Sequence, residues 1–306
     1  RESKKYQLRG EILSFIPVEK NVEVMLVTIT NTGRMAQTVT PTAAIPLYGR
    51  SADNIRDHRH VTSLLHRIET TDTGVLVTPT LSFDERGHQV NHMTYYCVGW
   101  SGNGEKPVDF YPTAEDFVGE GGNFERPYAI VKKAEGVKAG TRIEGLEAVG
   151  GLHFSEVTLE PEEECSYLIF TGITEDIQEI RNLSKTYTTR EMVLEELEKT
   201  KAYWQEKVNV AYHTGDSDFN QFMHWVSFQP ILRRIYGCSF LPHHDYGKGG
   251  RGWRDLWQDC LALLIMNPDG VRQMLLDNFA GVRVDGSNAT IIGSKQGEFV
   301  ADRNNI

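Results

Sequence analysis

The stretch Val22-Glu-Val-Met-Leu-Val-Thr-Ile-Thr30 has a period near two and ends at the turn-forming residues Asn31-Thr-Gly33. A period of two is that of a β-strand, because successive side chains point to opposite faces of a sheet. Comparable runs occupy residues 74–80, 94–100 and 152–159, with glycine-rich turns and no long helical pattern between them. Many short alternating strands predict an antiparallel β-sandwich over residues 1–174.

The last two runs of this region predict a hairpin. Pro161-Glu-Glu-Glu164 separates the run at 152–159 from one that ends Cys165-Ser-Tyr-Leu-Ile-Phe170. A proline followed by charged residues is typical of a turn, so the two runs are expected to pair with each other.

After Gly172 the apolar period becomes helical. Helices are expected over 176–187 and 189–208, the second opening with Thr188 and Glu191 at capping-box spacing, and we interpret residues 175–212 as a helical linker. Three more helices are expected in residues 213–306: one from Asp216 or Asp218 toward Ile231 with Pro230 as a kink or stop, one over 253–266, and one from Pro268 to Gly281. Repeated helices of this kind indicate the beginning of a helical toroid or bundle.

Composition excludes several classes of partner. The chain has 306 residues, a formal net charge of −10 and no apolar run long enough to span a bilayer. Nucleic acid and anionic membranes require a basic face, so a neutral small molecule is the better expectation. No secretory leader pattern opens the sequence, and a cytoplasmic location is expected.

The four cysteines, Cys97, Cys165, Cys238 and Cys260, are far apart and form no CxxC pair. This spacing indicates neither a zinc site nor a disulfide framework, so no metal is expected and the thiols should be free and buried.

The most informative segment for function is Tyr246-Gly-Lys-Gly-Gly-Arg-Gly-Trp-Arg-Asp-Leu-Trp-Gln-Asp259. A glycine-rich turn here leads directly into a helix. At about 100° per residue, one narrow arc of that helix is polar, whereas the remaining wide arc is apolar and is expected to pack. The polar arc holds Arg254, Asp255, Gln258, Asp259 and Ala262. A cation, an amide and two carboxylates beside Trp253 and Trp257 are typical of a site for hydroxyl-rich ligands such as sugars.

A plainer interpretation has equal weight on this segment alone. Arg251 and Arg254 could pair with Asp255 and Asp259 at helical spacing and stabilise an exposed helix. Four glycines between Gly247 and Gly252 favour the ligand site, because glycine is used where backbone must approach another group closely. Lys248 and the free N–H groups of the helix start would favour an anion there.

The order of sandwich, linking helices and helical region, together with Gly249-Gly-Arg-Gly-Trp-Arg-Asp255 and Gln258-Asp259, resembles the sugar phosphorylases of glycoside hydrolase family 94. The resemblance extends over nearly the whole chain and includes the phosphorylase-like part of cyclic β-1,2-glucan synthases. It implies a β-sandwich, a helical linker and the start of an (α/α)6 barrel at 213–306. It also implies a homodimer.

The activity that the resemblance implies is inverting phosphorolysis of a β-linked glucose disaccharide or oligosaccharide to α-glucose 1-phosphate. No cofactor is implied, and inorganic phosphate is the co-substrate. By the family motif, Arg251 and Asp255 hold the transferred sugar, and we expect Arg254, Gln258 and Asp259 to orient that pair. Arg303 and Asn304 are candidates for contact with the acceptor sugar.

The chain departs from the family pattern at the phosphate. The disaccharide phosphorylases have an arginine upstream of the motif, where this chain has Cys238-Ser-Phe-Leu-Pro-His-His-Asp-Tyr246. His243, His244 and Lys248 are the candidates to replace it. The general acid, an aspartate in the family, is expected beyond Ile306. Two other functions stay open, an inverting glycoside hydrolase on the same scaffold and a non-catalytic carbohydrate-binding protein.

Overall fold

The computed structural model describes residues 1–306 except 19, 50–58, 85–86, 237–250, 290, 293–298 and 301–306. For residues 59–60, 82–84, 87–88, 233, 235–236, 251–252, 255–256, 291–292 and 299–300 it describes the backbone alone. The chain divides into two compact units, Arg1–Thr200 and Lys201–Ile306.

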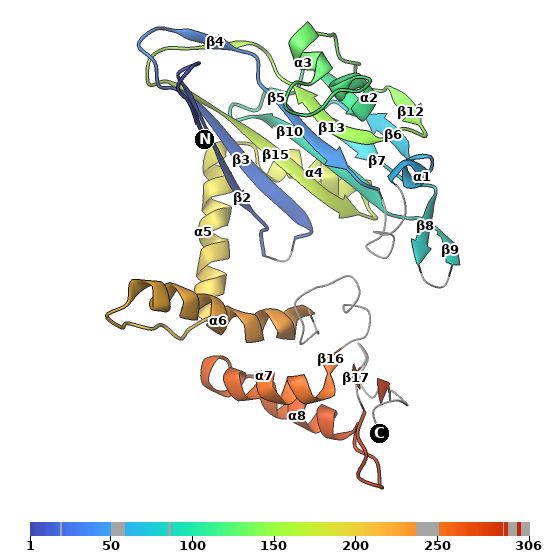
Figure 1. Ribbon diagram of the computed structural model, residues 1–306, viewed down its shortest axis with the longest axis vertical. Helices are drawn as coiled ribbons and strands as arrows, with labels where there is room; N and C mark the ends of the chain where they lie inside the picture. Colours follow the sequence, from blue (N-terminus) through green and yellow to red (C-terminus); the bar gives the residue numbers. More distant parts are fainter. Residues whose placement is uncertain are drawn as a thin grey trace. The chain divides into compact units, whose positions relative to one another are not determined.

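The first unit is built on an eight-stranded antiparallel sheet with the order β1-β2-β3-β15-β10-β7-β6-β12 (Figure 1). In that order the strands are Glu2–Ser3, Leu8–Phe15, Val22–Asn31, Glu164–Thr174, Thr94–Ser101, Gly74–Val77, Arg67–Thr70 and Arg142–Glu144. The predicted strands at 22–30, 74–80 and 94–100 are thus present as β3, β7 and β10.

A second, three-stranded sheet has the order β11-β13-β5 and packs against the large sheet. Its strands are Asp109–Thr113, Ala148–His153 and Thr42–Leu47. The unit also contains two strand pairs, β14 (Val157–Leu159) with β4 (Gln37–Val39) and β8 (Leu81–Asp84) with β9 (Gly87–Val90). Three short helices accompany the sheets, α1 (Arg59–Ser63), α2 (Ala114–Val118) and α3 (Tyr128–Lys132). The predicted antiparallel β-sandwich is therefore confirmed.

Strand β10 shows how the two faces of the large sheet are used. Val98 and Trp100 lie in a core that also contains residues of helix α4 (Ile177–Thr186), whereas Cys97 faces the core between the sheets. The alternation follows from the period of two. Between the sheets, a Cβ on Gly150 of β13 would clash with Cys97 Cβ, so glycine is required for this close approach. Helix α4 thus forms a third layer of the sandwich unit and is more than a connection.

The predicted hairpin between the runs at 152–159 and 165–170 is wrong. Residues 148–159 form two strands, β13 and β14, interrupted at 154–156. Strand β14 pairs with β4, and both edges of β15 are occupied by β3 and β10. An eleven-residue strand that is buried between two long neighbours forms more backbone hydrogen bonds than a short local hairpin would.

The linking helices begin with side-chain caps. Asp176 Oδ1 accepts from Gln178 N at 2.8 Å at the start of α4. At the start of α5 (Arg190–Lys207), Thr189 Oγ1 accepts from Met192 N at 3.5 Å, so the cap is Thr189 and the expected role of Thr188 is wrong by one residue. The cap donor is three residues after the cap in the chain, as capping geometry requires.

The second unit contains α6 (Ser217–Tyr236), α7 (Trp253–Met266) and α8 (Val271–Phe279), with a small sheet of β16 (Arg251–Gly252), β17 (Ile291–Ile292) and β18 (Phe299–Val300). Asp216 Oδ1 accepts from Asp218 N and Phe219 N at the start of α6. Pro230 does not stop this helix, which continues to Tyr236. The predicted domain boundaries at 174 and 212 stay predictions.

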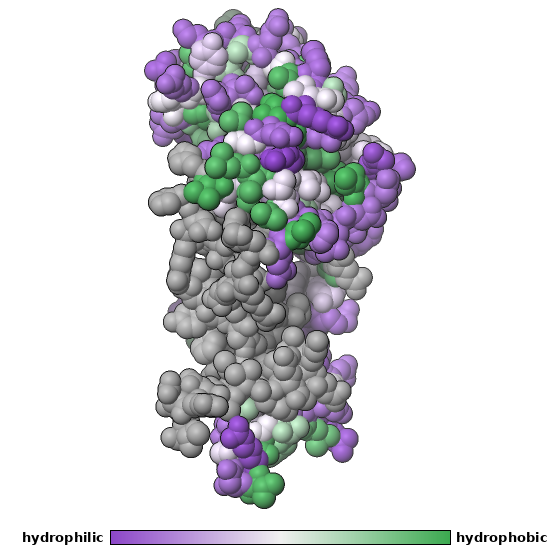
Figure 2. Space-filling model, turned by 90° about the vertical axis from the view of Figure 1, so that its right-hand side faces the viewer, coloured by the Kyte–Doolittle hydropathy of each residue, from purple (hydrophilic) through white to green (hydrophobic). Residues whose placement is uncertain are grey.

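On the coloured part of the face that Figure 2 displays, hydrophilic residues predominate and hydrophobic residues lie in groups among them. Among the described residues, every helix is too short or too polar to traverse a lipid bilayer. Of the cysteines in the described part, Cys97, Cys165 and Cys260 are free; Cys97 and Cys260 are buried and Cys165 is half-buried. Cys238 lies outside the described residues.

Candidate functional site

The predicted sugar site begins at β16, which leads without a spacer into α7. Arg251 and Gly252 pair with Ile292 and Ile291 of β17. The backbone of this part of the glycine-rich segment is therefore held in a strand, where the sequence indicated a free turn. Residues 246–250 lie outside the described residues.

The first turn of α7 is fastened to the end of α8. Trp253 Nε1 donates to the main-chain oxygen of Asn278 at 3.0 Å, and Asn278 Nδ2 donates to the main-chain oxygen of Trp253 at 3.4 Å. Trp253 and Trp257 meet edge to face, with ring centroids 5.6 Å apart, and Trp257 meets Phe279 in the same way at 4.7 Å. Reciprocal hydrogen bonds and aromatic contacts hold the helix start in one orientation.

Asn278 was not among the sequence-predicted site residues. It is 1% exposed, on a helix whose other buried contacts are apolar. A single buried amide in such a helix is the signal that could have identified it, because buried polar groups are retained where they form hydrogen bonds.

The burial of α7 differs from the prediction. Cys260, Leu263 and Met266 are buried, and Cys260 and Leu263 pack with Val271 of α8 and Ile231 of α6. The wide apolar arc was expected to pack throughout, but Leu261 and Leu264 are 68% and 52% exposed. The buried stripe follows the i, i+3 spacing of one helix face, and the described neighbours cover that face alone.

The residues of the polar arc of α7 also differ in their exposure to solvent. Arg254 and Gln258 are exposed, whereas Asp259 is 8% exposed. Arg251 lies in β16 and Asp255 in the first turns of α7, but their side chains are outside the described part. Their convergence on one sugar therefore stays a prediction.

Five other predicted site residues lie outside the described residues. They are His243, His244, Lys248, Arg303 and Asn304. Their assignment to phosphate and to the acceptor sugar stays a prediction.

Two buried polar atoms at the junction of α7 and α8 have no hydrogen-bond partner among the described residues. They are Trp257 Nε1, a donor, and Asn278 Oδ1, an acceptor. Unpaired buried groups are costly, and in folded proteins they are usually satisfied by water or a ligand.

The described residues contain no group of three or more His, Cys, Asp or Glu side chains arranged to hold a metal ion.

Comparison with known proteins identifies the family. Residues 2–190 match the supersandwich domain of glycosyl hydrolase 94. The chain belongs to glycosyl hydrolase family 94. The matched residues include both sheets of the sandwich and helix α4 and end at the first residue of α5.

Two curated proteins are similar to this member of family 94. Cyclic beta-(1,2)-glucan synthase NdvB of Rhizobium meliloti (strain 1021) is 27% identical over 203 residues, which are 62% of this chain and 6% of that protein. The 3-O-beta-D-glucopyranosyl-beta-D-glucuronide phosphorylase of Paenibacillus borealis is 26% identical over 185 residues, which are 59% of this chain and 22% of that protein. The chain thus spans less than a quarter of the length of either relative.

Among solved structures, a polysaccharide lyase aligns with 57% of this chain and 21% of its own, at 13% identity and a TM-score of 0.30. That similarity is too low to support an inference about the family 94 chain.

Proposed function

We propose that the protein to which this chain belongs catalyses reversible, inverting phosphorolysis of a β-linked glucose disaccharide or oligosaccharide. A phosphate oxygen attacks the anomeric carbon, the glycosidic C–O bond breaks, and a general acid protonates the leaving oxygen. The products are α-glucose 1-phosphate and a shortened sugar. Membership of family 94 is the observation that carries the proposal, and the similarity to a phosphorylase of that family supports it.

Arg251 and Asp255 are the proposed contacts with the transferred sugar. A carboxylate accepts hydrogen bonds from vicinal hydroxyl groups, and a guanidinium donates to their oxygens in a fixed fork. The clamp between Trp253 and Asn278 supports this assignment, because it fixes the backbone between the two residues. In this proposal Arg254, Gln258 and the buried Asp259 orient the pair.

The phosphate needs a cationic neighbourhood. Because phosphate is already an anion, the reaction requires a general acid but no base to activate water. His243, His244 and Lys248 are the proposed phosphate contacts, Arg303 and Asn304 the proposed acceptor contacts, and the acid is proposed to follow Ile306. We propose no cofactor and a homodimeric protein.

Helices α6 to α8 are the proposed beginning of an (α/α)6 barrel. Large apolar side chains are exposed on each of them, including Phe222 at 61%, Ile265 at 77% and Phe279 at 58%. Apolar surface on three successive helices is the pattern expected where further helices of a barrel would pack.

The test uses the full-length protein with β-1,2-, β-1,3- and β-1,4-linked glucobioses, each with and without inorganic phosphate. The β-1,2 disaccharide is included because a cyclic β-(1,2)-glucan synthase is among the relatives. Glucose 1-phosphate that forms only with phosphate supports the proposal. Free glucose in both reactions would instead indicate an inverting glycoside hydrolase. Binding without turnover would indicate a non-catalytic carbohydrate-binding protein.

A further inference from the structure

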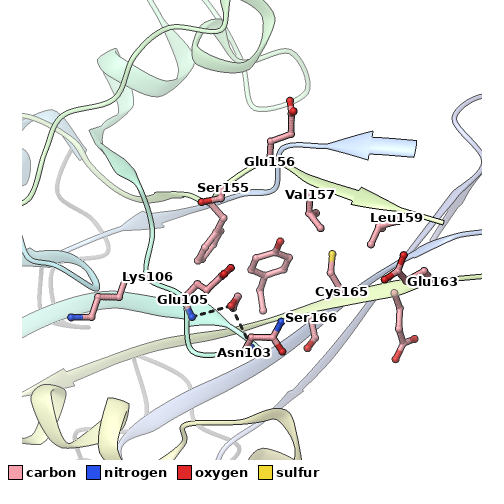
Figure 3. A pocket seen from close by; sticks show the side chains of 15 residues that line it. Asn103, Glu105, Lys106, Ser155, Glu156, Val157, Leu159, Glu163, Cys165 and Ser166 are labelled. Carbon is pink, nitrogen blue, oxygen red and sulfur yellow. Dashed lines mark hydrogen bonds between the residues drawn. The ribbon is translucent and has the colours of Figure 1, made fainter. Parts of the chain in front are cut away.

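A cavity of about 370 Å³ opens at the end of the sandwich where β10 ends and β15 begins (Figure 3). Its walls come from three segments: 101–106 after β10, 154–159 around β14, and 163–167 at the start of β15. The volume lies within the range of small-molecule sites, about 300–1,000 Å³. All of these residues belong to the sandwich unit, and none was among the predicted site residues.

The wall at 101–106 is a tight turn held by Ser101. Ser101 Oγ accepts from Asn103 N at 3.3 Å and from Glu105 N at 3.0 Å, as the dashed lines in Figure 3 show. Ser101 N donates to Glu105 O at 2.8 Å, and Gly104 has a φ of 85°. Gly102 N donates to Ser166 O at 2.7 Å, which joins the turn to β15. The backbone is therefore set before any ligand enters, which lowers the entropic cost of binding.

The accessible lining of the cavity is mostly polar, and buried apolar and aromatic side chains form its floor. Phe154, Leu159 and Tyr167 line it and are 3%, 1% and 6% exposed. The rings of Phe154 and Tyr167 pack at 4.6 Å between centroids. Burial raises the pKa of Tyr167 well above its ordinary value, so its hydroxyl stays protonated. The packed ring pair gives the cavity a rigid floor beneath its polar lining.

The rim is acidic, and two of its four carboxylates are already engaged. Glu163 Oε2 accepts from Glu160 N at 2.8 Å, and Glu164 forms an ion pair with Arg190 at 3.4 Å. The carboxylates of Glu105 and Glu156 form no hydrogen bond or ion pair within the described part of the chain. These two carboxylates line the cavity together with the polar side chains of Asn103, Ser155 and Ser166.

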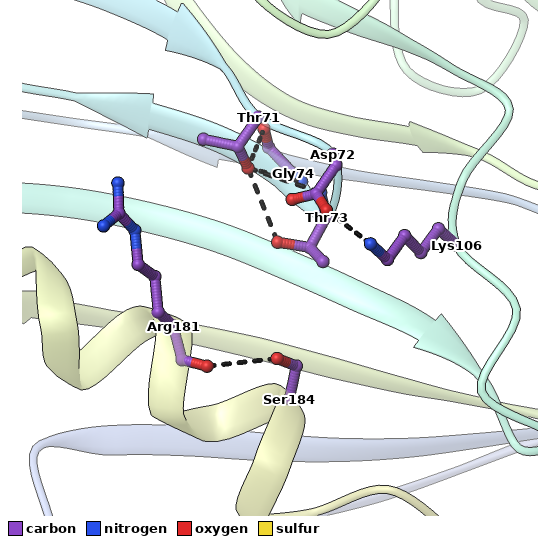
Figure 4. A network of polar contacts seen from close by, with 7 residues as sticks. All are labelled: Thr71, Asp72, Thr73, Gly74, Lys106, Arg181 and Ser184. Atoms are coloured by element: carbon purple, nitrogen blue, oxygen red, sulfur yellow. Dashed lines mark hydrogen bonds and ion pairs between the residues drawn. The ribbon is translucent and has the colours of Figure 1, made fainter.

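The lysine of the rim is directed elsewhere. Lys106 extends away from the cavity in Figure 3 and pairs with Asp72, in the turn between β6 and β7 (Figure 4). That turn is itself fixed, because Thr71 Oγ1 accepts from Gly74 N at 3.1 Å. With its cation held away, the cavity offers acceptors and an amide, and it would repel phosphate and other anions.

We propose that this cavity is a second carbohydrate site, which takes one end of a neutral β-glucan oligosaccharide. Glu105 and Glu156 accept hydrogen bonds from sugar hydroxyl groups, and Asn103 donates to a ring or hydroxyl oxygen. A metal ion is disfavoured because the described residues hold no cluster of ligands for one.

The site is independent of the proposed phosphorolysis. It lies in residues 101–167, whereas the proposed donor contacts are Arg251 and Asp255. Binding in the cavity would keep a long substrate attached to the protein. It would leave the reaction of a disaccharide unchanged. A loss confined to long substrates therefore separates this inference from the proposed activity.

The test is a calorimetric titration of the full-length protein with β-1,2-, β-1,3- and β-1,4-linked glucotetraoses. The test protein carries Asp255→Asn, which removes the proposed donor contact, and it is compared with a protein that also carries Glu105→Gln and Glu156→Gln. We expect the two glutamine substitutions to weaken tetraose binding at least tenfold. The matched control is Glu125→Gln, an exposed carboxylate outside the cavity, which should leave binding unchanged.

A second set of measurements distinguishes a loss of tetraose binding from a loss of folding. In a protein that retains Asp255, the glutamine substitutions at 105 and 156 should leave the thermal unfolding temperature and the turnover of disaccharide unchanged. No tetraose binding by the Asp255→Asn protein, or binding that the glutamine substitutions leave intact, would overturn the inference. So would spermidine, used as a polyamine probe, if it bound in the cavity while no tetraose did.

Discussion

The indole nitrogen of Trp100 on β10 donates to the main-chain oxygen of Tyr187 at 2.8 Å and is buried. Trp100 also stacks on Phe170 with ring centroids 4.8 Å apart, and Phe170 stacks on Tyr187 at 5.5 Å. Residues 87 positions apart in the chain are thus joined by a hydrogen bond and a row of three rings. The contact fastens the end of α4 to the large sheet.

Trp100→Phe is expected to destabilise the sandwich unit. The substitution removes the hydrogen bond, leaves the Tyr187 oxygen buried without a donor, and reduces packing against Phe170, for a loss of about 2–4 kcal/mol. Urea unfolding followed by far-UV circular dichroism measures it. Trp225→Phe is the control, because Trp225 is 47% exposed and its replacement should change the free energy of unfolding by less than about 1 kcal/mol. An equal decrease in the free energy of unfolding in the two variants would contradict the role of Trp100 in fastening α4 to the large sheet.

Gly150→Ala is expected to disturb the packing between the sheets. A Cβ at residue 150 would overlap Cys97 Cβ on β10, so the sheets must separate or the backbone must shift, at a cost of about 1–3 kcal/mol. The midpoint of thermal unfolding measures the effect. Gly10→Ala in β2 is the matched control, since a Cβ there has no neighbour within 4 Å among the described residues. A stable Gly150→Ala protein would show that the sheets are not in close contact at this point.

Leu263→Ala and Leu264→Ala test the burial of α7 with adjacent residues of the same type. Leu263 is fully buried and Leu264 is 52% exposed. Truncation of the first should cost about 2–5 kcal/mol, whereas truncation of the second should cost well under half of that. Hydrogen exchange at the α7 amides distinguishes them. If the two substitutions lower the free energy of unfolding equally, Leu264 must be as well buried as Leu263, by parts of the protein outside the described residues.

Asp255→Asn is expected to impair the reaction of the full-length protein and to spare its fold. Loss of a charged hydrogen bond to the transferred sugar, worth about 1.5–3 kcal/mol, lowers kcat/KM by about ten- to a hundred-fold. Asp269→Asn, an exposed site between α7 and α8, is the control. Unchanged kinetics in Asp255→Asn, or a drop in unfolding temperature as large as that of Leu263→Ala, would remove Asp255 from the sugar site.

Stability is expected to fall at high pH in a way that depends on Cys97. Burial raises the pKa of this thiol from 9.0 to about 12. Between these values the unfolded chain loses a proton that the folded chain keeps, so the free energy of unfolding decreases as pH rises, by up to about 1.4 kcal/mol per pH unit for one group. Tyr96, whose pKa burial also raises to about 12, adds to the decrease above pH 10.

The measurement compares the parent with Cys97→Ala in urea titrations from pH 8 to pH 11. The variant lacks the thiol, so its free energy of unfolding should decrease less steeply above pH 9, whatever its stability at pH 8. Parallel curves for the two proteins would refute the contribution of Cys97.

Local sequence patterns predicted several long strands and the longer helices of the fold. Strands β3, β7 and β10 and helices α4, α6 and α7 lie where the apolar period placed them, because that period reflects which side of each element meets the core. Pairing was harder to predict. The hairpin expected around Pro161 is absent, because β3 is a better partner for β15 than the adjacent β14, although it is more than 130 residues away.

The candidate sites show the same limit. The motif at Arg251 and Asp255 was visible in the sequence because its residues are close together in the chain. Asn278, which clamps that helix start, and the cavity formed by 101–106, 154–159 and 163–167 were not visible, because their parts meet only when distant strands and helices pack.

The sequence by itself determined that this chain begins with an antiparallel sandwich and continues into helices. Periodicity and short motifs involve residues that are close together in the chain, so they can be recognised without knowledge of the fold. Only the tertiary structure decided which strands pair, that α4 covers one face of the large sheet, and that a polar cavity forms at the end of β10. These features depend on contacts between residues far apart in the chain, and no local pattern encodes which distant partner offers the better packing.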